Sequence, residues 1–293
     1  MFFFGRCGRR ALCRISVFYM QHIKRKTMNK KIAPLCLIAL LFASCGYGKD
    51  VWTPLFNGRN LDNWEKFIGP PFEGHEDLAA TAVPDSVFSV VDLDGQKVIR
   101  ISGEVFGSLA TKGTYRNFHA RVVMKWGSKI TRELNCGLLY YGHGPFGAGF
   151  GTWKSSVECQ MRHGNMGALY MIGEDIALDA ETERHGTNYT YKAGAECVKF
   201  GKAEERRMIL GASDAENKIG QWNTIEIYCV GQRSVHVVNG KVTMRTSGIS
   251  ASEGGKEIPL TGGCLQLQSE GAELFVKSVE IQPIKEIPAE LAK

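Results

Sequence analysis

The chain has 293 residues, 44% of them hydrophobic, and a formal net charge of +6. The first 44 residues hold nine Lys and Arg and no Asp or Glu, so the remainder carries 27 basic against 30 acidic side chains, a net of −3. The excess of positive charge therefore belongs to the N-terminal segment, and it gives no reason to expect nucleic acid as a partner.

The first 44 residues have the composition of a targeting sequence. Residues 1–27 are basic and have no fold pattern, so Met28 is the expected true start. From there a Lys-bearing segment, the apolar run Ile32–Leu41 and a small-residue end at Cys45 follow the layout of a lipoprotein signal peptide. The apolar run is too short to cross a bilayer. A transit peptide or an internal core helix is the alternative.

These features predict the organisation of the chain. Residues 28–44 would be removed, Cys45 would carry the lipid, and residues 45–51 would form a short linker to one domain over residues 52–286. The length of that domain suffices for one large β-domain with a full core. The mature protein would lie in a bacterial cell envelope, facing the periplasm, with the lipid anchor as its only contact to the membrane.

Five cysteines remain after Cys45, at positions 136, 159, 197, 229 and 264. An odd number without a CxxC pair argues against a disulfide framework or a zinc ribbon. Cys159 and Cys229 fall on apolar faces of strand-like runs, where a buried thiol behaves as a small hydrophobic side chain. A nucleophilic cysteine is the alternative.

Most of the chain after residue 52 alternates apolar and polar residues in short runs separated by glycine-bearing turns. The runs are Phe88–Val91, Val98–Ile101, Phe118–Trp126, Gly137–Tyr141, Val157–Met161, Thr224–Val230, Ser234–Val238, Lys241–Arg245, Cys264–Gln268 and Glu273–Pro283. Asp92–Gly95 and Asn239-Gly240 have the composition of hairpin turns. The pattern predicts an all-β domain, a two-sheet sandwich or jelly roll.

Two segments interrupt this pattern. Lys202–Ile209 is weakly helical in composition. Ala177–Lys199 has little periodicity, and long irregular loops in a compact domain are usually functional. Ala177–Lys199 is therefore expected to be a binding loop that, together with the glycine-rich loop Gly142–Gly151, forms the walls of a cleft.

The stretch Ser155–Ile172 has the most distinctive polar pattern. Its first half alternates, so one face is apolar and the other carries Glu158, Gln160 and Arg162. Such a face is either exposed to solvent or the floor of a polar cleft. A glycine-bearing turn with His163 follows it.

Several segments resemble, in the right order, the DUF1080 family, also called the 3-keto-disaccharide hydrolase domain. They are Pro54–Trp64, Gly107–Trp126, Asn135–Pro145, Ser156–Gly173 and Gly220–Val242, followed by the closing strands in Leu265–Ile281. The resemblance spans roughly residues 52–284. It implies a concanavalin-like jelly-roll β-sandwich that acts on 3-keto sugars.

Members of this family are similar to enzymes that cleave a 3-keto-glycoside made beforehand by an oxidoreductase, so a sugar 3-dehydrogenase is the implied functional partner. The ketone at C3 acidifies the hydrogen at C2, and its removal allows the C1 substituent to leave by β-elimination, with or without later addition of water. This chemistry needs a base, a group that stabilises the enolate and an acid. No nucleotide cofactor is expected.

The resemblance implies three catalytic candidates. Glu158 matches the Glu of the family's E-x-Q strand motif and is the first choice for the catalytic carboxylate. His163 is a candidate base beside it, and the pair is a candidate site for a divalent metal that would act as a Lewis acid. Lys112, at the Lys of the family's L-x-T-K segment, could stabilise enolate charge. For each, the alternative is an ordinary exposed side chain.

The residues expected to hold the sugar are Asn135, Tyr141, His143, Trp153, Gln160 and Arg162. Rings such as Tyr141 and Trp153 can stack against a pyranose, although core packing is the expected fate of at least one of the aromatic rings here. Loop residues such as His143 carry function more often than core strands. Asn165 and Ala168 stand where the family often has acidic residues. This departure predicts altered activity.

Two other functions are compatible with the pattern. A non-catalytic carbohydrate-binding module on the same sandwich is the main rival. A glycoside hydrolase of the laminarinase type would show two carboxylates spaced on one strand, and the strand here offers Glu158 alone.

Overall fold

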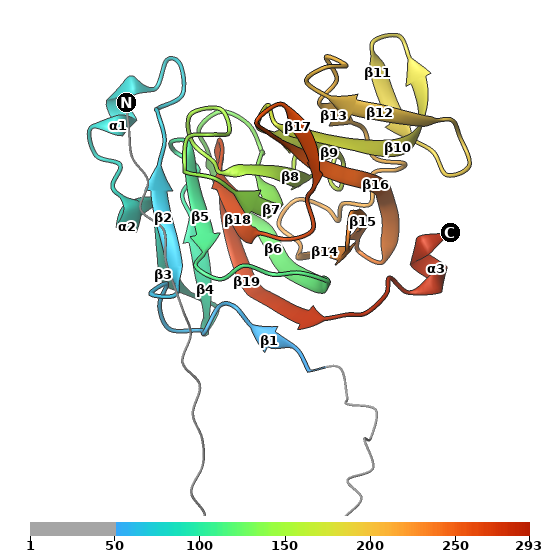
Figure 1. Ribbon diagram of the computed structural model, residues 1–293. Helices are drawn as coiled ribbons and strands as arrows, with labels where there is room; N and C mark the ends of the chain where they lie inside the picture. The colour runs from blue at the N-terminus through green and yellow to red at the C-terminus, as the bar shows by residue number, and fades with distance from the viewer. Residues whose placement is uncertain (1–50) are drawn as a thin grey trace, which may run out of the picture. The chain divides into compact units, whose positions relative to one another are not determined.

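The structure is a computed structural model that describes residues 51–293, and these residues form one compact unit (Figure 1). The expected upstream segment over residues 1–27, the signal peptide over 28–44 and the lipidation site Cys45 lie outside the described residues. Within the described part of the chain, no helix is both long and apolar enough to cross a membrane.

The larger sheet contains twelve strands. Nine of them follow one another in hydrogen-bonded order: β11 (Asn188–Tyr191), β10 (Ile176–His185), β16 (Lys241–Glu253), β15 (Arg233–Val238), β14 (Asn223–Val230), β6 (Phe118–Ile130), β19 (Ala272–Pro283), β4 (Gln96–Ile101) and β3 (Phe88–Leu93). Three more pair at the side of this path: β1 (Thr53–Pro54) with β19, β12 (Cys197–Gly201) with β10, and β17 (Lys256–Pro259) with β16.

The smaller sheet contains seven strands, and it positions the site described below. Its order is β13 (Met208–Ile209), β9 (Leu169–Ile172), β8 (Ser155–Gln160), β7 (Gly137–His143), β18 (Cys264–Ser269), β5 (Gly107–Thr111) and β2 (Trp64–Ile68). The helices are short: α1 (Glu76–Ala79), α2 (Pro84–Val87) and α3 (Ala289–Ala292). Figure 1 shows α1 and α2 beside β2, at the end of the domain opposite β10, β11 and β12.

The apolar core lies between the two sheets. On β14 every second residue is buried, as in Ile225, Ile227 and Cys229. Val157 and Cys159 of β8, in the other sheet, belong to the same apolar cluster. All strand pairs are antiparallel, and the expected all-β sandwich of two sheets is confirmed.

Both expected hairpin turns are present. Asp94 and Gly95 connect β3 to β4 with φ of 54° and 77°, and Asn239 and Gly240 connect β15 to β16 with φ of 48° and 80°. These left-handed conformations suit Asp, Asn and Gly, and their twist matches that of the flanking strands.

The two segments that interrupt the sequence pattern differ from expectation. Ala177–Lys199 is not an irregular loop: it lies mainly in β10, β11 and β12, and its period is hidden because the buried positions of β10 include small and polar residues such as Ala180 and Thr182. The helix expected over Lys202–Ile209 is wrong: Lys202–Glu205 form a turn in which Glu205 has a φ of 52°, and Met208–Ile209 form β13.

A small polar network lies inside the sandwich. The imidazole of His236 is fully buried, with Nε2 3.0 Å from the Tyr140 hydroxyl and Nδ1 3.2 Å from the carbonyl oxygen of Gly167. The Tyr140 hydroxyl also lies 2.6 Å from that of Ser234. Burial lowers the pKa of His236 to about 4, so the ring is neutral at pH 7.

We expect His236 to make the domain less stable in acid. Below the ordinary pKa of 6.5, His236 is protonated in the unfolded chain but stays neutral in the folded domain. The contribution of His236 to the free energy of unfolding is therefore complete above pH 6.5 and decreases as the pH falls toward 4. The loss is about 3 kcal/mol at most. Thermal melts of the wild type and His236→Gln at pH 7.5 and 5 measure this difference. The exposed control His185→Gln should follow the wild type, and equal slopes in all three proteins would contradict the assignment.

Candidate active site

The polar face of the smaller sheet points away from the core. Because β8 alternates, Val157 and Cys159 enter the core while Ser156, Glu158 and Gln160 lie on the opposite face. Of these, Glu158 is buried, with 2% of its surface exposed, although it does not face the core. A carboxylate is rarely buried in this way without a functional reason.

A cleft of about 490 Å³ opens above Glu158. Its polar lining consists of Arg132, Asn135, Glu158, Gln160, Arg162 and Glu270, and its apolar lining consists of Phe106, Phe150, Trp153, Tyr170, Ile172 and Met208. The cleft therefore combines two carboxylates and two guanidinium groups with a wall of aromatic rings. Such rings suit the apolar faces of a sugar.

Glu158 and Glu270 form an interacting pair of carboxyl groups. Burial, and then the charge of Glu270, raise the pKa of Glu158 well above its ordinary value. Burial, and then the charge of Glu133, raise the pKa of Glu270 to about 8, against the lowering effect of Arg132 and Arg162. Two such groups do not both ionise easily, so the pair holds at least one proton near pH 7.

Several buried polar atoms around this pair have no hydrogen-bond partner among the described residues. They are Asn135 Oδ1, Glu158 Oε1, Gln160 Oε1, Gln268 Nε2 and Gln268 Oε1. A buried polar atom left in this state costs about 1–3 kcal/mol. Five of the ten such atoms in the described part of the chain lie here, where water, an ion or a polar ligand can supply their partners.

Gly137 on β7 makes room for the two central side chains. A Cβ at this position would collide with Glu158 Oε1 and with Gln268 Oε1. Glu158 from β8 and Gln268 from β18 therefore come together over the glycine that lies on the strand between them.

Residues 144–154 cross the polar face of the sheet and close one side of the cleft. The ring of Phe146 stacks on Phe67, with centroids 4.9 Å apart and an interplanar angle of 5°. The indole of Trp153 packs on Leu139 and donates its Nε1–H to the carbonyl oxygen of Gly107 at 2.9 Å. Of the expected glycine-rich wall Gly142–Gly151, Phe150 lines the cleft, and Trp153, just beyond that loop, lines it as well.

The structure brings together five of the residues selected from the sequence. Asn135, Trp153, Glu158, Gln160 and Arg162 all line the cleft. Their roles in binding or catalysis stay predictions.

The structure does not bring His163 or Tyr141 to the cleft. His163 lies two residues after Met161, which belongs to the core. Its Nδ1 lies 2.8 Å from Glu216 Oε2, so His163 does not form the expected pair with Glu158. Tyr141 has a φ of 57° at a β-bulge, and its buried ring donates a hydrogen bond from its hydroxyl to the carbonyl oxygen of Gly231. Although both residues lie in or close in sequence to strands that carry the cleft, neither side chain lies on the polar face of the smaller sheet.

Lys112 and His143 lie in a different hollow. The ammonium of Lys112 donates a hydrogen bond to the carbonyl oxygen of Asp62 at 2.6 Å. The His143 Nε2 lies 2.6 Å from Asp175 Oδ2. Both residues line a cavity whose lining shares no residue with the cleft of Glu158, so the expected contact of Lys112 with the enolate is not supported.

Sequence reasoning missed several residues of the cleft lining, including Arg132 and Glu270, and it also missed Gln268, which lies beside Glu158. Gln268 lies in β18 and Glu270 directly follows it, within a stretch that the sequence identified only as closing strands. The alternation from Leu265 places Gln266 and Gln268 on a polar face, which is the signal that could have found them. Asn165 and Ala168, by contrast, do not line the cleft, so the acids missing there remove nothing from its lining.

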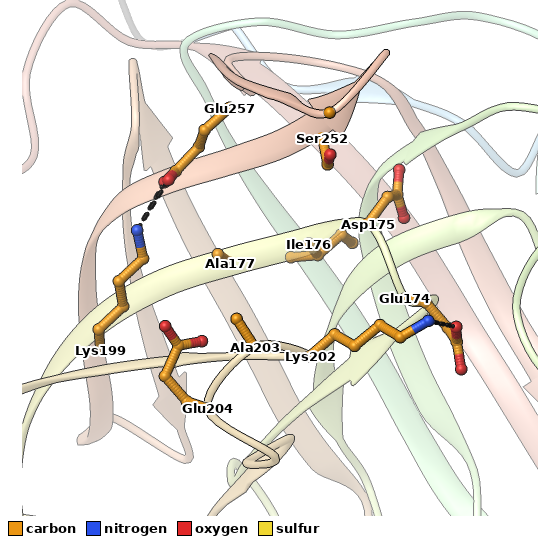
Figure 2. A pocket seen from close by; sticks show the side chains of 11 residues that line it. Glu174, Asp175, Ile176, Ala177, Lys199, Lys202, Ala203, Glu204, Ser252 and Glu257 are labelled. Atoms are coloured by element: carbon orange, nitrogen blue, oxygen red, sulfur yellow. Dashed lines mark hydrogen bonds and ion pairs between the residues drawn. The ribbon is translucent and has the colours of Figure 1, made fainter.

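Another hollow, of about 530 Å³, lies beside β10 and contains Ala177 and Lys199 of the segment once expected to wall the cleft. Figure 2 shows that its cations are already paired, Lys199 with Glu257 and Lys202 with Glu174. No residue of the Ala177–Lys199 segment lines the cleft of Glu158, so that part of the expectation is wrong.

A family model described as the 3-keto-alpha-glucoside-1,2-lyase-like domain matches residues 51–282. The chain belongs to this family. No curated protein matches the chain. Membership supports a carbohydrate-active function for the cleft.

Solved structures with a similar arrangement share little sequence with this member of the 3-keto-alpha-glucoside-1,2-lyase-like family. A candidate glycosyl hydrolase from Parabacteroides distasonis is 20% identical over 80% of this chain and 100% of that chain, with a TM-score of 0.46. A Bacillus subtilis protein with a galectin-like fold is 9% identical over 79% and 94%, with a TM-score of 0.46. A Bacillus licheniformis β-glucanase is 12% identical over 81% and 100%, with a TM-score of 0.41.

The structure does not form the Glu158–His163 pair that was expected to hold a divalent metal. Among residues 51–293, no group of three or more His, Cys, Asp and Glu side chains is arranged to hold a metal ion. The oxygen donors at the cleft are the carboxylates of Glu158 and Glu270 and the side-chain oxygens of Asn135, Gln160 and Gln268, and hard divalent cations prefer oxygen donors of this kind. These oxygens, and not His163, would hold such an ion.

We expect Glu270→Gln to stabilise the domain at alkaline pH. Because the folded pKa of Glu270 is about 8, above its ordinary 4.5, this one carboxyl group carries no penalty below pH 4.5 and destabilises the domain increasingly as the pH rises toward 8. Glutamine removes this penalty and should raise stability by about 1–2 kcal/mol at pH 8, with little change at pH 4.5. Thermal melts across this range measure it. The exposed control Glu253→Gln should show no such trend, and a Glu270→Gln protein less stable at pH 8 than the wild type would refute the assignment.

Proposed function

We propose that this protein cleaves the glycosidic bond of 3-keto-glycosides by abstracting the C2 proton and eliminating the C1 substituent. One observation carries the proposal: Glu158 and Glu270 share a cleft in which burial keeps the carboxyl group of Glu158 protonated, whereas Glu270, with a pKa of about 8, ionises as the pH rises toward 8. Elimination beside a ketone needs this combination of base and acid.

Glu270 is the proposed base. It is the less buried of the two carboxyl groups and lies beside Arg132 and Arg162, so it ionises first. Its carboxylate takes the C2 proton, and the electrons of the C2–H bond form an enolate with the C3 carbonyl. The amide Nε2–H of Gln268, which has no partner among the described residues, is the proposed donor to the enolate oxygen.

Glu158 is the proposed acid, because its complete burial keeps its carboxyl group protonated. The enolate collapses to a C1–C2 double bond, the C1–O bond breaks, and the leaving oxygen takes the proton of Glu158. The products are a 2-hydroxy-3-keto-glycal and an alcohol. Glu270 now holds the proton and Glu158 the charge, so one proton passing between them restores the starting state.

The remaining cleft residues suit a sugar. Asn135 Oδ1 and Gln160 Oε1 can each accept a hydrogen bond from a hydroxyl group, and Trp153 and Tyr170 offer rings for a pyranose face. A divalent cation held by the carboxylates would supply Lewis-acid stabilisation of the enolate. Because the substrate must first be oxidised at C3, a sugar 3-dehydrogenase is the proposed functional partner.

The test is incubation of the purified protein with a 3-keto-glucoside that carries a chromogenic leaving group. We expect release of the chromophore together with the ultraviolet absorbance of the enone, and no reaction with the unoxidised glucoside. Saturable binding of the 3-keto-glucoside without any turnover, with and without added divalent cations, would support the rival carbohydrate-binding module instead.

A further inference from the structure

A second hollow of about 370 Å³ lies on the smaller sheet, apart from the cleft of Glu158. Its walls come from the residues after β5, from the end of β7 and from the start of β18, and Lys154 closes it at the start of β8. The charged side chains that line it are Lys112, Arg116, His143 and Lys154, and no Asp or Glu belongs to this lining.

Two of these cations, Lys112 and Arg116, form no ion pair with a carboxylate among residues 51–293. The ammonium of Lys112 is bonded to a neutral acceptor, the carbonyl oxygen of Asp62. The guanidinium of Arg116 has no hydrogen bond or ion pair within residues 51–293. Lys154 pairs with Glu65 at 3.2 Å, but Glu65 lies outside the lining, so the hollow faces mostly positive charge.

His143 also lines the hollow, and its charge is paired with the carboxylate of Asp175. Its Nδ1 lies 2.9 Å from the carbonyl oxygen of Tyr141, and its Nε2 lies 2.6 Å from Asp175 Oδ2. Both partners only accept hydrogen bonds, so both ring nitrogens must donate and the imidazole is a cation. Burial opposes this charge, but the bonds to Asp175 and Tyr141 outweigh it and raise the pKa of His143.

The backbone holds the hollow in shape. Tyr115 and Gly263 exchange two hydrogen bonds of 2.8 and 3.1 Å, which fixes the turn after β5 against the start of β18. A Cβ at Gly262 would collide with Cγ of Arg116, so the glycine lets the arginine stem lie close to the wall. Arg116 and Lys112 therefore project from one anchored turn.

From this arrangement we propose that the hollow is a binding site for a tetrahedral oxyanion, a sulfate or phosphate group carried on a sugar. Lys112 and Arg116 reach it from the turn after β5, and Lys154 reaches it from the start of β8. Point charges from more than one direction suit a tetrahedral anion better than a planar carboxylate, which a single guanidinium binds in bidentate fashion. The volume exceeds what the anion alone requires, so the group is attached to a larger molecule. The proposal is independent of the reaction at Glu158.

The test is calorimetric titration of the purified protein at low ionic strength with inorganic sulfate, inorganic phosphate, glucose 6-sulfate, glucose 6-phosphate and glucose. We expect saturable binding of the anions, tighter for the sugar esters, and none of glucose. Whether the sulfate ester or the phosphate ester binds more tightly identifies which of the two groups the site recognises. Lys112→Gln and Arg116→Gln should each weaken binding about tenfold, because each removes a charge-assisted hydrogen bond.

The matched control is Lys97→Gln, which removes an exposed lysine from β4 of the other sheet. It should bind as the wild type does. Lys112 and Arg116 are exposed, so their variants are expected to fold, and thermal melts verify this. Absence of saturable binding by the wild type, or equal weakening in all three variants, would overturn the proposal.

Discussion

Glu158→Gln is expected to lower kcat/KM on a 3-keto-glucoside by about 10²–10⁴-fold. Glutamine keeps the shape of the side chain but cannot give a proton to the leaving oxygen. Glu270→Gln is expected to cause a loss of similar size, because the C2 proton then has no acceptor.

For the wild type, kcat/KM should follow a bell-shaped pH profile in which one limb reports the shared proton of the pair.

The readout separates catalysis from folding. Circular dichroism and thermal melts of both variants should show the wild-type fold, and Glu253→Gln, a substitution at an exposed position, should retain full activity. A leaving group that needs no protonation should rescue Glu158→Gln but not Glu270→Gln. If either variant turned over substrate as fast as the wild type, the catalytic role assigned to that residue would be wrong.

Gly137→Ala is expected to reduce kcat/KM by about 10²-fold while leaving the fold intact. The added Cβ would collide only with the far ends of two side chains, Glu158 Oε1 and Gln268 Oε1, which can rotate away. Stability should therefore change by no more than about 1 kcal/mol, whereas the carboxyl group and the amide lose their positions.

Gly211→Ala is the matched control. Its Cβ would lie 3.6 Å from the nearest atoms, an ordinary contact, and Gly211 does not line the cleft. We expect wild-type kinetics and stability from it. If Gly137→Ala turned over substrate as fast as Gly211→Ala, the placement of Glu158 over Gly137 would not matter to the reaction.

Local patterns in the sequence predicted most of the fold. Period-two alternation located the long strands, and the composition of Asp92–Gly95 and Asn239-Gly240 located two hairpins. The same alternation failed in β10, because Ala180 and Thr182 occupy inward positions without being strongly apolar. Glu205 broke an apparent helix by adopting a left-handed conformation in a turn.

The candidate site was predicted only in part, for a physical reason. The polar face of β8 could be read directly, so Glu158 and Gln160 were found. The second carboxyl group, Glu270, follows β18, and nothing local to either segment shows that β7 brings β8 and β18 into one sheet. The prediction for His163 failed in the opposite way: it is close to Glu158 in sequence, but it lies in the turn after β8, where its Nδ1 contacts Glu216.

If the cleft binds a sugar as proposed, the unpartnered atoms around Glu158 also decide which sugars it rejects. A sugar that lacks a hydroxyl at the matching position would leave Asn135 Oδ1 or Gln160 Oε1 buried and still unpaired. A site built to hydrogen-bond a group rejects an analogue without it far more strongly than an apolar pocket rejects a missing methylene, by about 10⁴–10⁵ against about 10–200-fold. Deoxy sugars should therefore be excluded at binding, before any chemistry begins.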